Sequence, residues 1–174
     1  MSELNPIVVV DYDPIWPELF ESLRRRIAVA LGPMASRIEH VGSTAVPCLA
    51  AKPIIDMDVL LVSEASLPVA IARLAVIGYA HQGNLGIAGR EAFLAPAGDP
   101  PHHLYVCPPD SVELRRHLAF RDYLRTHPED AGRYGDLKVA LAGRFQTDRS
   151  AYTEAKGELV RELTNRAEIW MRAG

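Results

Sequence analysis

Hydrophobic and polar positions along the first part of the chain follow two different periods. Apolar side chains recur at helical spacing over residues 16–31, just after the helix-start pair Asp13–Pro14, and again over residues 67–77. Short apolar or β-branched runs, separated by glycine and proline turns, predict strands over residues 7–10, 38–41, 54–62, 79–82, 90–95 and 103–107. The first part of the chain therefore mixes helices and strands.

The pattern changes from residue 111 onward, where the apolar spacing is helical throughout. It predicts helices over residues 111–126, 129–146 and 149–172. Strands mixed with helices, followed by helices alone, are typical of an α/β or α+β fold. We expect a mixed β-sheet flanked by helices over residues 1–110, and a C-terminal part of three helices over residues 111–174 that packs on it within one structural domain.

Two aspartates interrupt the most apolar of the predicted strands, residues 54–62. Asp56 and Asp58 are two positions apart, so both side chains point to one face, with Cα atoms roughly 6.5 Å apart. Two carboxylates among aliphatic neighbours repel each other and are poorly hydrated, so they need a cation or a polar partner. Mg²⁺ (or Mn²⁺) binds such oxygen ligands and brings substrate phosphates with it. The alternative is that both aspartates lie at a solvated strand end.

A glycine-serine turn precedes the acidic strand. Gly42 lets a phosphate approach the backbone closely, and the hydroxyl of Ser43 can donate a hydrogen bond to it. Lys52, between the turn and the strand, is a candidate to reach either a phosphate or a carboxylate. His103, on a later predicted strand, is a candidate to join the two aspartates as a metal ligand.

Each of the three predicted C-terminal helices carries a cation inside its apolar stripe. At about 100° per residue, Arg121, Lys138 and Lys156 fall among the leucine and aromatic positions of their helices. A buried charge needs a partner, although a long side chain can also extend past the stripe to water. We predict that the three cations converge on an anion, either a substrate phosphate or the protein's own Asp56 and Asp58.

Composition and charge limit the binding partners and the cellular compartment that we expect. The chain of 174 residues is enough for one folded domain, and 48% hydrophobic with 24% charged residues is ordinary globular usage. A net charge of −3 gives no indication of nucleic-acid binding. No apolar run approaches the roughly 18 residues that a membrane span needs. Cys48 and Cys107 lie outside any CxxC motif, which favours a reducing cytoplasm over a disulfide scaffold or a zinc site.

The turn and the acidic strand together form a longer motif. Twelve residues separate Ser43 from Asp56, so the string reads hydrophobic-Gly-Ser, a spacer, then Asp-hydrophobic-Asp-hydrophobic. This string resembles the signature of the polymerase-β-like nucleotidyltransferase superfamily. The resemblance implies that the glycine-serine turn holds a nucleoside triphosphate and that the aspartate pair binds metal.

A closer resemblance covers nearly the whole chain. It rests on YDPIW at 12–16, IEHVGSTAVP at 38–47, LAAKPIIDMDV at 49–59, FRDYLRTHPE at 120–129, YGDLKVALA at 134–142 and YTEAK at 152–156. These segments resemble the GrpB-like family, whose members are bacterial stand-alone proteins, with a related domain fused to dephospho-coenzyme A kinase. The resemblance implies a nucleotidyltransferase-like fold and leaves the reaction and the substrate open.

The chain departs from the superfamily pattern in one place. Active members usually carry a third carboxylate on a later strand of the sheet. The corresponding segment here, residues 102–106, offers histidine and tyrosine and no acid. Glu91 and Asp99 are the candidate substitutes, and His103 is the alternative occupant of that position.

Three functions compete on these grounds. The leading hypothesis is an Mg²⁺-dependent nucleotidyltransferase that holds a triphosphate at Gly42 and Ser43, and whose helical cations clamp the phosphates or an acceptor not identified by the sequence. The second is a non-catalytic module that binds a nucleotide or another phosphorylated ligand, such as a coenzyme A precursor. The third is a metal-dependent hydrolase that uses His103. A third carboxylate beside the aspartate pair would favour transfer, whereas His103 in that place would favour binding or hydrolysis.

Overall fold

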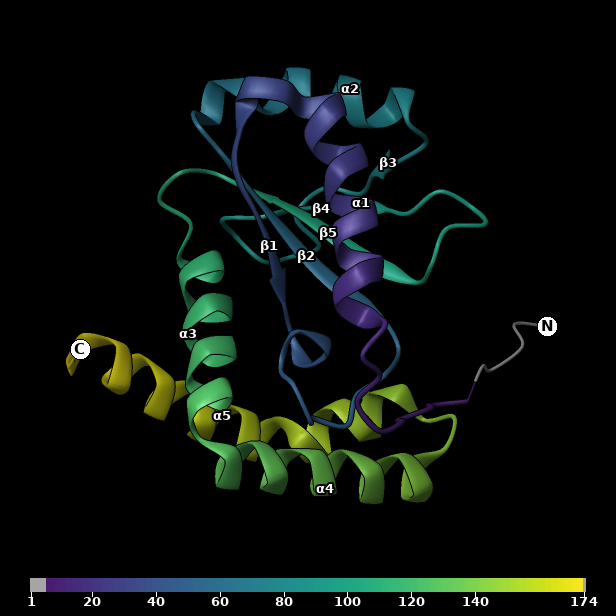
Figure 1. Cartoon of the computed structure of the whole chain (residues 1–174), viewed down its shortest axis with the longest axis vertical. Helices are drawn as coiled ribbons and strands as arrows, with labels where there is room; N and C mark the ends of the chain where they lie inside the picture. Colours follow the sequence, from purple (N-terminus) through teal and green to yellow (C-terminus); the bar gives the residue numbers. More distant parts are fainter. Residues whose placement is uncertain (1–5, 174) are drawn as a thin grey trace.

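The computed structural model describes residues 6–173, in which five helices surround a five-stranded sheet (Figure 1). The helices are α1 (Trp16–Leu31), α2 (Leu67–Val76), α3 (Val112–Thr126), α4 (Pro128–Phe145) and α5 (Arg149–Ala173). The strands are β1 (Ala35–Val41), β2 (Ile55–Leu61), β3 (Ala80–His81), β4 (Glu91–Leu94) and β5 (His102–Cys107). Short 3₁₀ turns η1 (Gly32–Met34), η2 (Ser43–Ala45) and η3 (Glu64–Ser66) complete these elements.

The sheet has the strand order β1-β2-β5-β4-β3. Strand β2 is antiparallel to β1 and parallel to β5, while β4 is antiparallel to both β5 and β3. The parallel pair is in a register that sets Asp56 opposite His103 and Asp58 opposite Tyr105. The acidic strand is therefore an inner strand of a mixed sheet, as the sequence predicts.

The main hydrophobic core lies between one face of the sheet and helices α1 and α2. Strand β2 contributes its odd-numbered side chains to this core, among them Ile55, Met57 and Val59. Because side chains alternate along a strand, Asp56 and Asp58 point to the opposite face. The prediction that both aspartates share one face of a buried strand is confirmed.

The C-terminal helices have a core of their own, built around the segment that follows the glycine-serine turn. Val46 and Leu49 pack with α3, α4 and α5, where Tyr134 and Leu163 are among their partners. Figure 1 shows α3 descending beside β1, and α4 and α5 lying across the end of the sheet from which that segment emerges. This packing brings the helical cations towards the acidic face of β2. The division of the chain at residue 110 stays a prediction.

Most predicted elements match those of the structure within a few residues, but the strand predicted over residues 7–10 is wrong. Val10 forms only an isolated bridge with Ala51. The amide of Ile7 donates to the carbonyl of Gln146 at 2.6 Å. The segment is thus bonded to a loop and to the end of α4, so its backbone groups are not used along a strand edge.

Candidate functional site

The glycine-serine turn is in direct contact with the acidic strand. Strand β1 ends at Val41, and Gly42 has a φ of 72°, a conformation that favours glycine. A β-carbon added at Gly42 would lie 2.3 Å from Oδ2 of Asp56. Only glycine therefore allows the turn to lie this close to the strand, and Ser43 then begins η2 beside Asp56.

A cavity of about 260 Å³ opens between this turn, β2, β5 and the C-terminal helices. It is lined by all of the predicted site residues except Asp58 and Arg121. Tyr134 of α4 and Tyr152 of α5 also line it. The structure therefore brings together, from distant parts of the chain, the residues Gly42, Ser43, Lys52, Asp56, His103, Lys138 and Lys156.

The lysines of the cavity face aromatic rings. Nζ of Lys138 lies 4.3 Å from the centroid of the Tyr134 ring. The ring of Tyr152 has Nζ of Lys52 at 4.4 Å and Nζ of Lys156 at 5.1 Å. Within residues 6–173, none of the three lysines forms an ion pair, because the one carboxylate in the cavity, Asp56, pairs with a histidine. Aromatic faces stabilise ammonium groups without neutralising them, so within residues 6–173 no carboxylate is paired with the charge of these lysines.

Burial lowers the pKa of all three amines, and a neighbouring lysine adds to this effect at Lys138 and at Lys156. Lys138 is only 3% exposed, and burial together with the charge of Lys156 lowers its pKa to about 7, against a smaller opposing effect of Asp56. Burial also lowers the pKa of Lys52 and of Lys156. Nζ of Lys138 donates to Oγ of Ser43 at 2.8 Å, which holds the amine beside the glycine-serine turn.

The ring of Tyr152 lines this cavity, but its hydroxyl is buried without a partner. The side chain is 1% exposed, and among the described residues its oxygen has no hydrogen-bond partner. A buried unpaired hydroxyl costs about 1–3 kcal/mol, and because this oxygen is closed off from solvent, it is not available to a ligand in the cavity.

His103 of β5 lies beside Asp56, where a third carboxylate would favour nucleotidyl transfer. Its Nδ1 lies 2.8 Å from Oδ1 of Asp56 across the β2–β5 pair, and this hydrogen bond raises the pKa of His103. Glu91 and Asp99 are not near the aspartates, since each forms an ion pair elsewhere, on β3–β4 and with α1. The position is therefore filled by an imidazole.

Asp58 is turned away from the cavity towards helix α3. It is fully buried, and its Oδ2 accepts from Nδ1 of His117 at 2.6 Å. Burial opposes protonation of His117, but the hydrogen bond and the charge of Asp58 raise its pKa overall. The other oxygen of Asp58, Oδ1, is buried and has no hydrogen-bond partner among residues 6–173. Asp58 thus bridges the sheet and α3.

The arrangement does not fit a divalent metal held by both aspartates. Each carboxylate already accepts a hydrogen bond from an imidazole, His103 or His117. Asp58 does not line the cavity that Asp56 faces. In the part of the chain that the structure describes, no group of three histidine, cysteine or acidic side chains is placed to hold a metal ion. The predicted set Asp56, Asp58 and His103 therefore does not converge on one point.

Arg121 is also placed away from the cavity. Its guanidinium donates to Oε2 of Glu39 at 2.8 Å and to Asp122 at 2.7 Å, and it also reaches the backbone carbonyl of His40. The cation in the apolar stripe of α3 therefore has carboxylate partners of its own and does not converge with Lys138 and Lys156. It ties α3 to β1.

The two tyrosines are functional candidates that the sequence prediction missed. Tyr134 and Tyr152 each stand four residues before a cavity lysine, in YGDLK on α4 and YTEAK on α5. Residues four apart lie on the same helix face, so this repeated spacing was the available signal.

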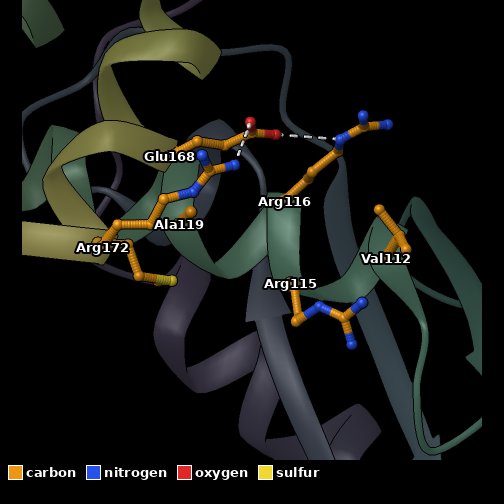
Figure 2. A pocket seen from close by; sticks show the side chains of 7 residues that line it. Val112, Arg115, Arg116, Ala119, Glu168 and Arg172 are labelled. Atoms are coloured by element: carbon orange, nitrogen blue, oxygen red, sulfur yellow. Dashed lines mark hydrogen bonds and ion pairs between the residues drawn. The ribbon is translucent and has the colours of Figure 1, made fainter.

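A larger cavity, of about 360 Å³, lies between the start of α3 and the end of α5 (Figure 2). Figure 2 shows Glu168 between Arg116 and Arg172, to which it is ion-paired at 3.1 and 3.8 Å. None of the predicted site residues lines this cavity. Because the predicted site residues gather in the smaller, lysine-lined cavity, we assign the candidate site there.

Comparison with known proteins identifies the family. The sequence model described as GrpB protein matches residues 6–166. The chain belongs to the GrpB family. UPF0157 protein PA4798 of Pseudomonas aeruginosa is 41% identical over 167 residues, which cover 92% of this chain and 67% of that protein. UPF0157 protein YqkA of Bacillus subtilis is 33% identical, over 95% of this chain and 48% of that protein.

A relative outside the UPF0157 proteins carries an enzyme's name. A dephospho-CoA kinase of Mycolicibacterium paratuberculosis is 29% identical over 190 residues, covering 95% of this chain and 47% of that protein. The present GrpB chain thus spans about half the length of this kinase and of YqkA.

Solved structures establish the fold of the family. A crystal structure of conserved protein GrpB from Enterococcus faecalis has a TM-score of 0.86 at 34% identity, over 94% of this chain and 99% of that one. Cid1 in complex with the UTP analog UMPNPP has a TM-score of 0.57 at 11% identity, over 87% of this chain and 48% of that one. The predicted nucleotidyltransferase-like fold is confirmed. Among the described residues of this GrpB chain, no helix has the length and apolar character that crossing a membrane requires.

Proposed function

We propose that this GrpB-family protein binds a nucleotide or another phosphorylated small molecule through its phosphates in the lysine-lined cavity. One observation carries the proposal: Lys52, Lys138 and Lys156 converge on one cavity and face tyrosine rings instead of carboxylates. Three lysine side chains without ion-pair partners among residues 6–173 form a receptor for a multiply charged anion.

A neutral donor complements these cations. The hydroxyl of Ser43 lies at the turn, in the wall of the cavity. Each charge-assisted hydrogen bond to a phosphate oxygen contributes roughly 1.5–3 kcal/mol, so three of them contribute about 4.5–9 kcal/mol towards binding. The carboxylate of Asp56, which would repel an anion, is partly neutralised by its hydrogen bond with His103.

The ligand class follows from the site and its relatives. In the superfamily signature, a glycine-serine turn holds the triphosphate of a nucleotide. The turn at Gly42 and Ser43 therefore supports a nucleotide as the ligand. A relative named dephospho-CoA kinase extends the candidates to coenzyme A precursors, by analogy alone. His103 beside Asp56, where transferases usually carry a third acid, favours binding over nucleotidyl transfer.

A thermal-shift panel tests the proposal. Pyrophosphate, nucleoside triphosphates and coenzyme A precursors are each added with and without Mg²⁺ or Mn²⁺. A ligand at 100 times its dissociation constant should stabilise the protein by about 2.7 kcal/mol. Lys156→Met should remove the shift, whereas Arg161→Met, which removes an exposed cation from the same helix, should keep it. No shift with any phosphate-bearing ligand, or equal loss in both variants, would reject the proposal.

Nucleotidyl transfer is the second candidate function. It is supported by the fold shared with Cid1 and by an aspartate pair on one strand face behind the glycine-serine turn. It would require His103 and His117 to release the carboxylates so that a divalent metal can bind them. Release of pyrophosphate from a nucleoside triphosphate, together with Mn²⁺ binding lost in Asp56→Asn, would promote this candidate above the first.

A further inference from the structure

The distribution of lysine in this protein is unusual. Of the nineteen basic residues apart from histidine, sixteen are arginine, and the only three lysines are Lys52, Lys138 and Lys156. All three line the same cavity. Everywhere else in the chain a positive charge is supplied by arginine, so charge alone does not explain why the cavity holds amines.

An amine offers chemistry that a guanidinium does not. Arginine keeps its proton at any physiological pH, whereas a desolvated lysine near other cations loses its proton and becomes a nucleophile. The characteristic reaction of such an amine is condensation with an aldehyde or a ketone. A cavity that holds three lysines and no arginine is therefore suited to capture a carbonyl group as well as a phosphate.

We propose that Nζ of Lys138 forms a reversible imine with the carbonyl carbon of a small phosphorylated aldehyde, whose phosphate is held by Lys52 and Lys156. The proposal rests on the proposed function for the phosphate and goes beyond it for the covalent step.

The amines of the cavity face two different rings, which suits a ligand with two groups. Lys52 and Lys156 both face the ring of Tyr152. Lys138 faces the ring of Tyr134, on the neighbouring helix. A phosphate held by Lys52 and Lys156 leaves Lys138 to bind the carbonyl group.

Lys138 is also positioned for the proton transfers of the reaction. Its Nζ is hydrogen-bonded to Oγ of Ser43 at 2.8 Å. The neutral amine adds to the carbonyl carbon to give a carbinolamine, in which the nitrogen loses a proton and the oxygen gains one. The hydroxyl then leaves as water with the remaining proton of the nitrogen, which forms the C=N bond, so the step needs no oxidant or reductant. The Ser43 hydroxyl can relay a proton between the two atoms.

The charges around Lys138 favour the reactive form. Burial and the charge of Lys156 lower its pKa to about 7, while Asp56 acts weakly in the opposite direction, and Tyr134 presents a neutral phenol whose pKa burial raises to about 12. About half of such an amine is neutral at pH 7, compared with about 0.04% of an ordinary lysine. The reactive fraction is thus larger by a factor on the order of 10³.

Pyridoxal 5′-phosphate, a phosphorylated aldehyde, is a direct probe. The intact protein is incubated with it at pH 7, reduced with sodium borohydride, and mapped by peptide mass spectrometry. The expected result is one label per chain, at Lys138. Pyridoxal, which lacks the phosphate, should label Lys138 at least about tenfold more slowly, and Lys156→Met should remove this difference. A label confined to Lys52, to Lys156 or to the N-terminal amine would overturn the proposal.

Lys138→Arg keeps the positive charge and cannot form an imine, so this variant should lose the label. Phosphate binding is measured separately, on the parent protein with pyrophosphate in the thermal-shift assay. If pyrophosphate stabilises the parent protein and no aldehyde labels Lys138, the imine is rejected and phosphate binding stands. If Lys138 is labelled equally by both aldehydes and pyrophosphate has no effect, the phosphate site is rejected.

Discussion

Gly42 and Asp56 are in such close contact that a β-carbon on residue 42 would lie 2.3 Å from Oδ2 of the aspartate. The contact joins the end of β1 to the acidic strand and sets the place of Ser43 at the cavity. Because φ at Gly42 is 72° and ψ is −171°, an alanine there has both a strained backbone and a steric clash. The geometry of the cavity therefore depends on the absence of one carbon atom.

Gly42→Ala should lower stability and ligand binding together. Backbone strain of this kind costs about 1–3 kcal/mol, and the displaced Asp56 should further reduce affinity for pyrophosphate by tenfold or more. Gly83→Ala is the matched control, because its φ is also 72° but nothing lies within 4 Å of the added carbon. Urea unfolding and a binding titration measure both effects. Equal losses of binding in the two variants would show that the contact with Asp56 has no role in the site.

Lys138→Met should stabilise the ligand-free protein. Methionine keeps the apolar stem and removes a buried charge for which the described residues provide no carboxylate. We expect the free energy of unfolding at pH 6 to rise by about 1–4 kcal/mol, measured in urea. A loss of about 3–5 kcal/mol would instead reveal a permanent ion pair.

The gain in free energy of unfolding caused by Lys138→Met should decrease as pH rises. The pKa of Lys138 is lowered from 10.5 to about 7 in the folded protein. Between these values the unfolded chain binds more protons than the folded one, so the parent gains stability as pH rises from 7 towards 10. The advantage of Lys138→Met should therefore shrink over that range. A pH-independent difference would mean that Lys138 titrates as an ordinary lysine.

The helices and the cavity lysines could be predicted from the sequence because their signals are local. Residues four apart on one helix share a face whatever the rest of the chain does, which places Lys138 and Lys156 in apolar surroundings. The same reasoning applied to Arg121 gives the wrong partner. Its partner Glu39 is 82 residues away in the chain, and helical periodicity contains no information about that distance.

The partners of the two aspartates on the acidic strand also could not be predicted from local patterns in the sequence. That Asp56 and Asp58 share a face follows from the alternation of a strand. Which groups meet them depends on how α3 and β5 pack, because His117 lies 59 residues from Asp58 and His103 lies 47 residues from Asp56. The sequence therefore predicts that these carboxylates need partners, and only the tertiary structure shows imidazoles in that role.

Asp58→Asn should weaken folding. The carboxylate is fully buried, and its Oδ2 is bonded to His117 at 2.6 Å, so the change removes a charge-assisted hydrogen bond worth about 1.5–3 kcal/mol. Asp136→Asn, at an exposed position on α4, is the control and should change stability by less than about 0.5 kcal/mol. If Asp58 served chiefly to hold a metal ion, its replacement would instead leave stability level or raised, and would abolish Mn²⁺ binding measured by calorimetry.

Phosphate binding should be coupled to proton uptake by Lys138. In the empty cavity the pKa of Lys138 is about 7, lowered by burial and by Lys156 against a smaller effect of Asp56, so the amine is mostly neutral at pH 8. An anion bound beside it favours the charged form and raises the pKa again. Titration calorimetry with pyrophosphate at pH 8, in buffers of different ionisation enthalpy, should therefore show uptake approaching one proton per site beyond that of Lys138→Arg.

Lys138→Arg is the control. Because its guanidinium is always charged, the proton uptake measured with this variant comes from the ligand itself. At pH 6 the difference between the two proteins should disappear, because Lys138 is then protonated before the ligand binds. Equal proton uptake by both proteins at pH 8 would show that the amine of Lys138 does not titrate when the anion binds.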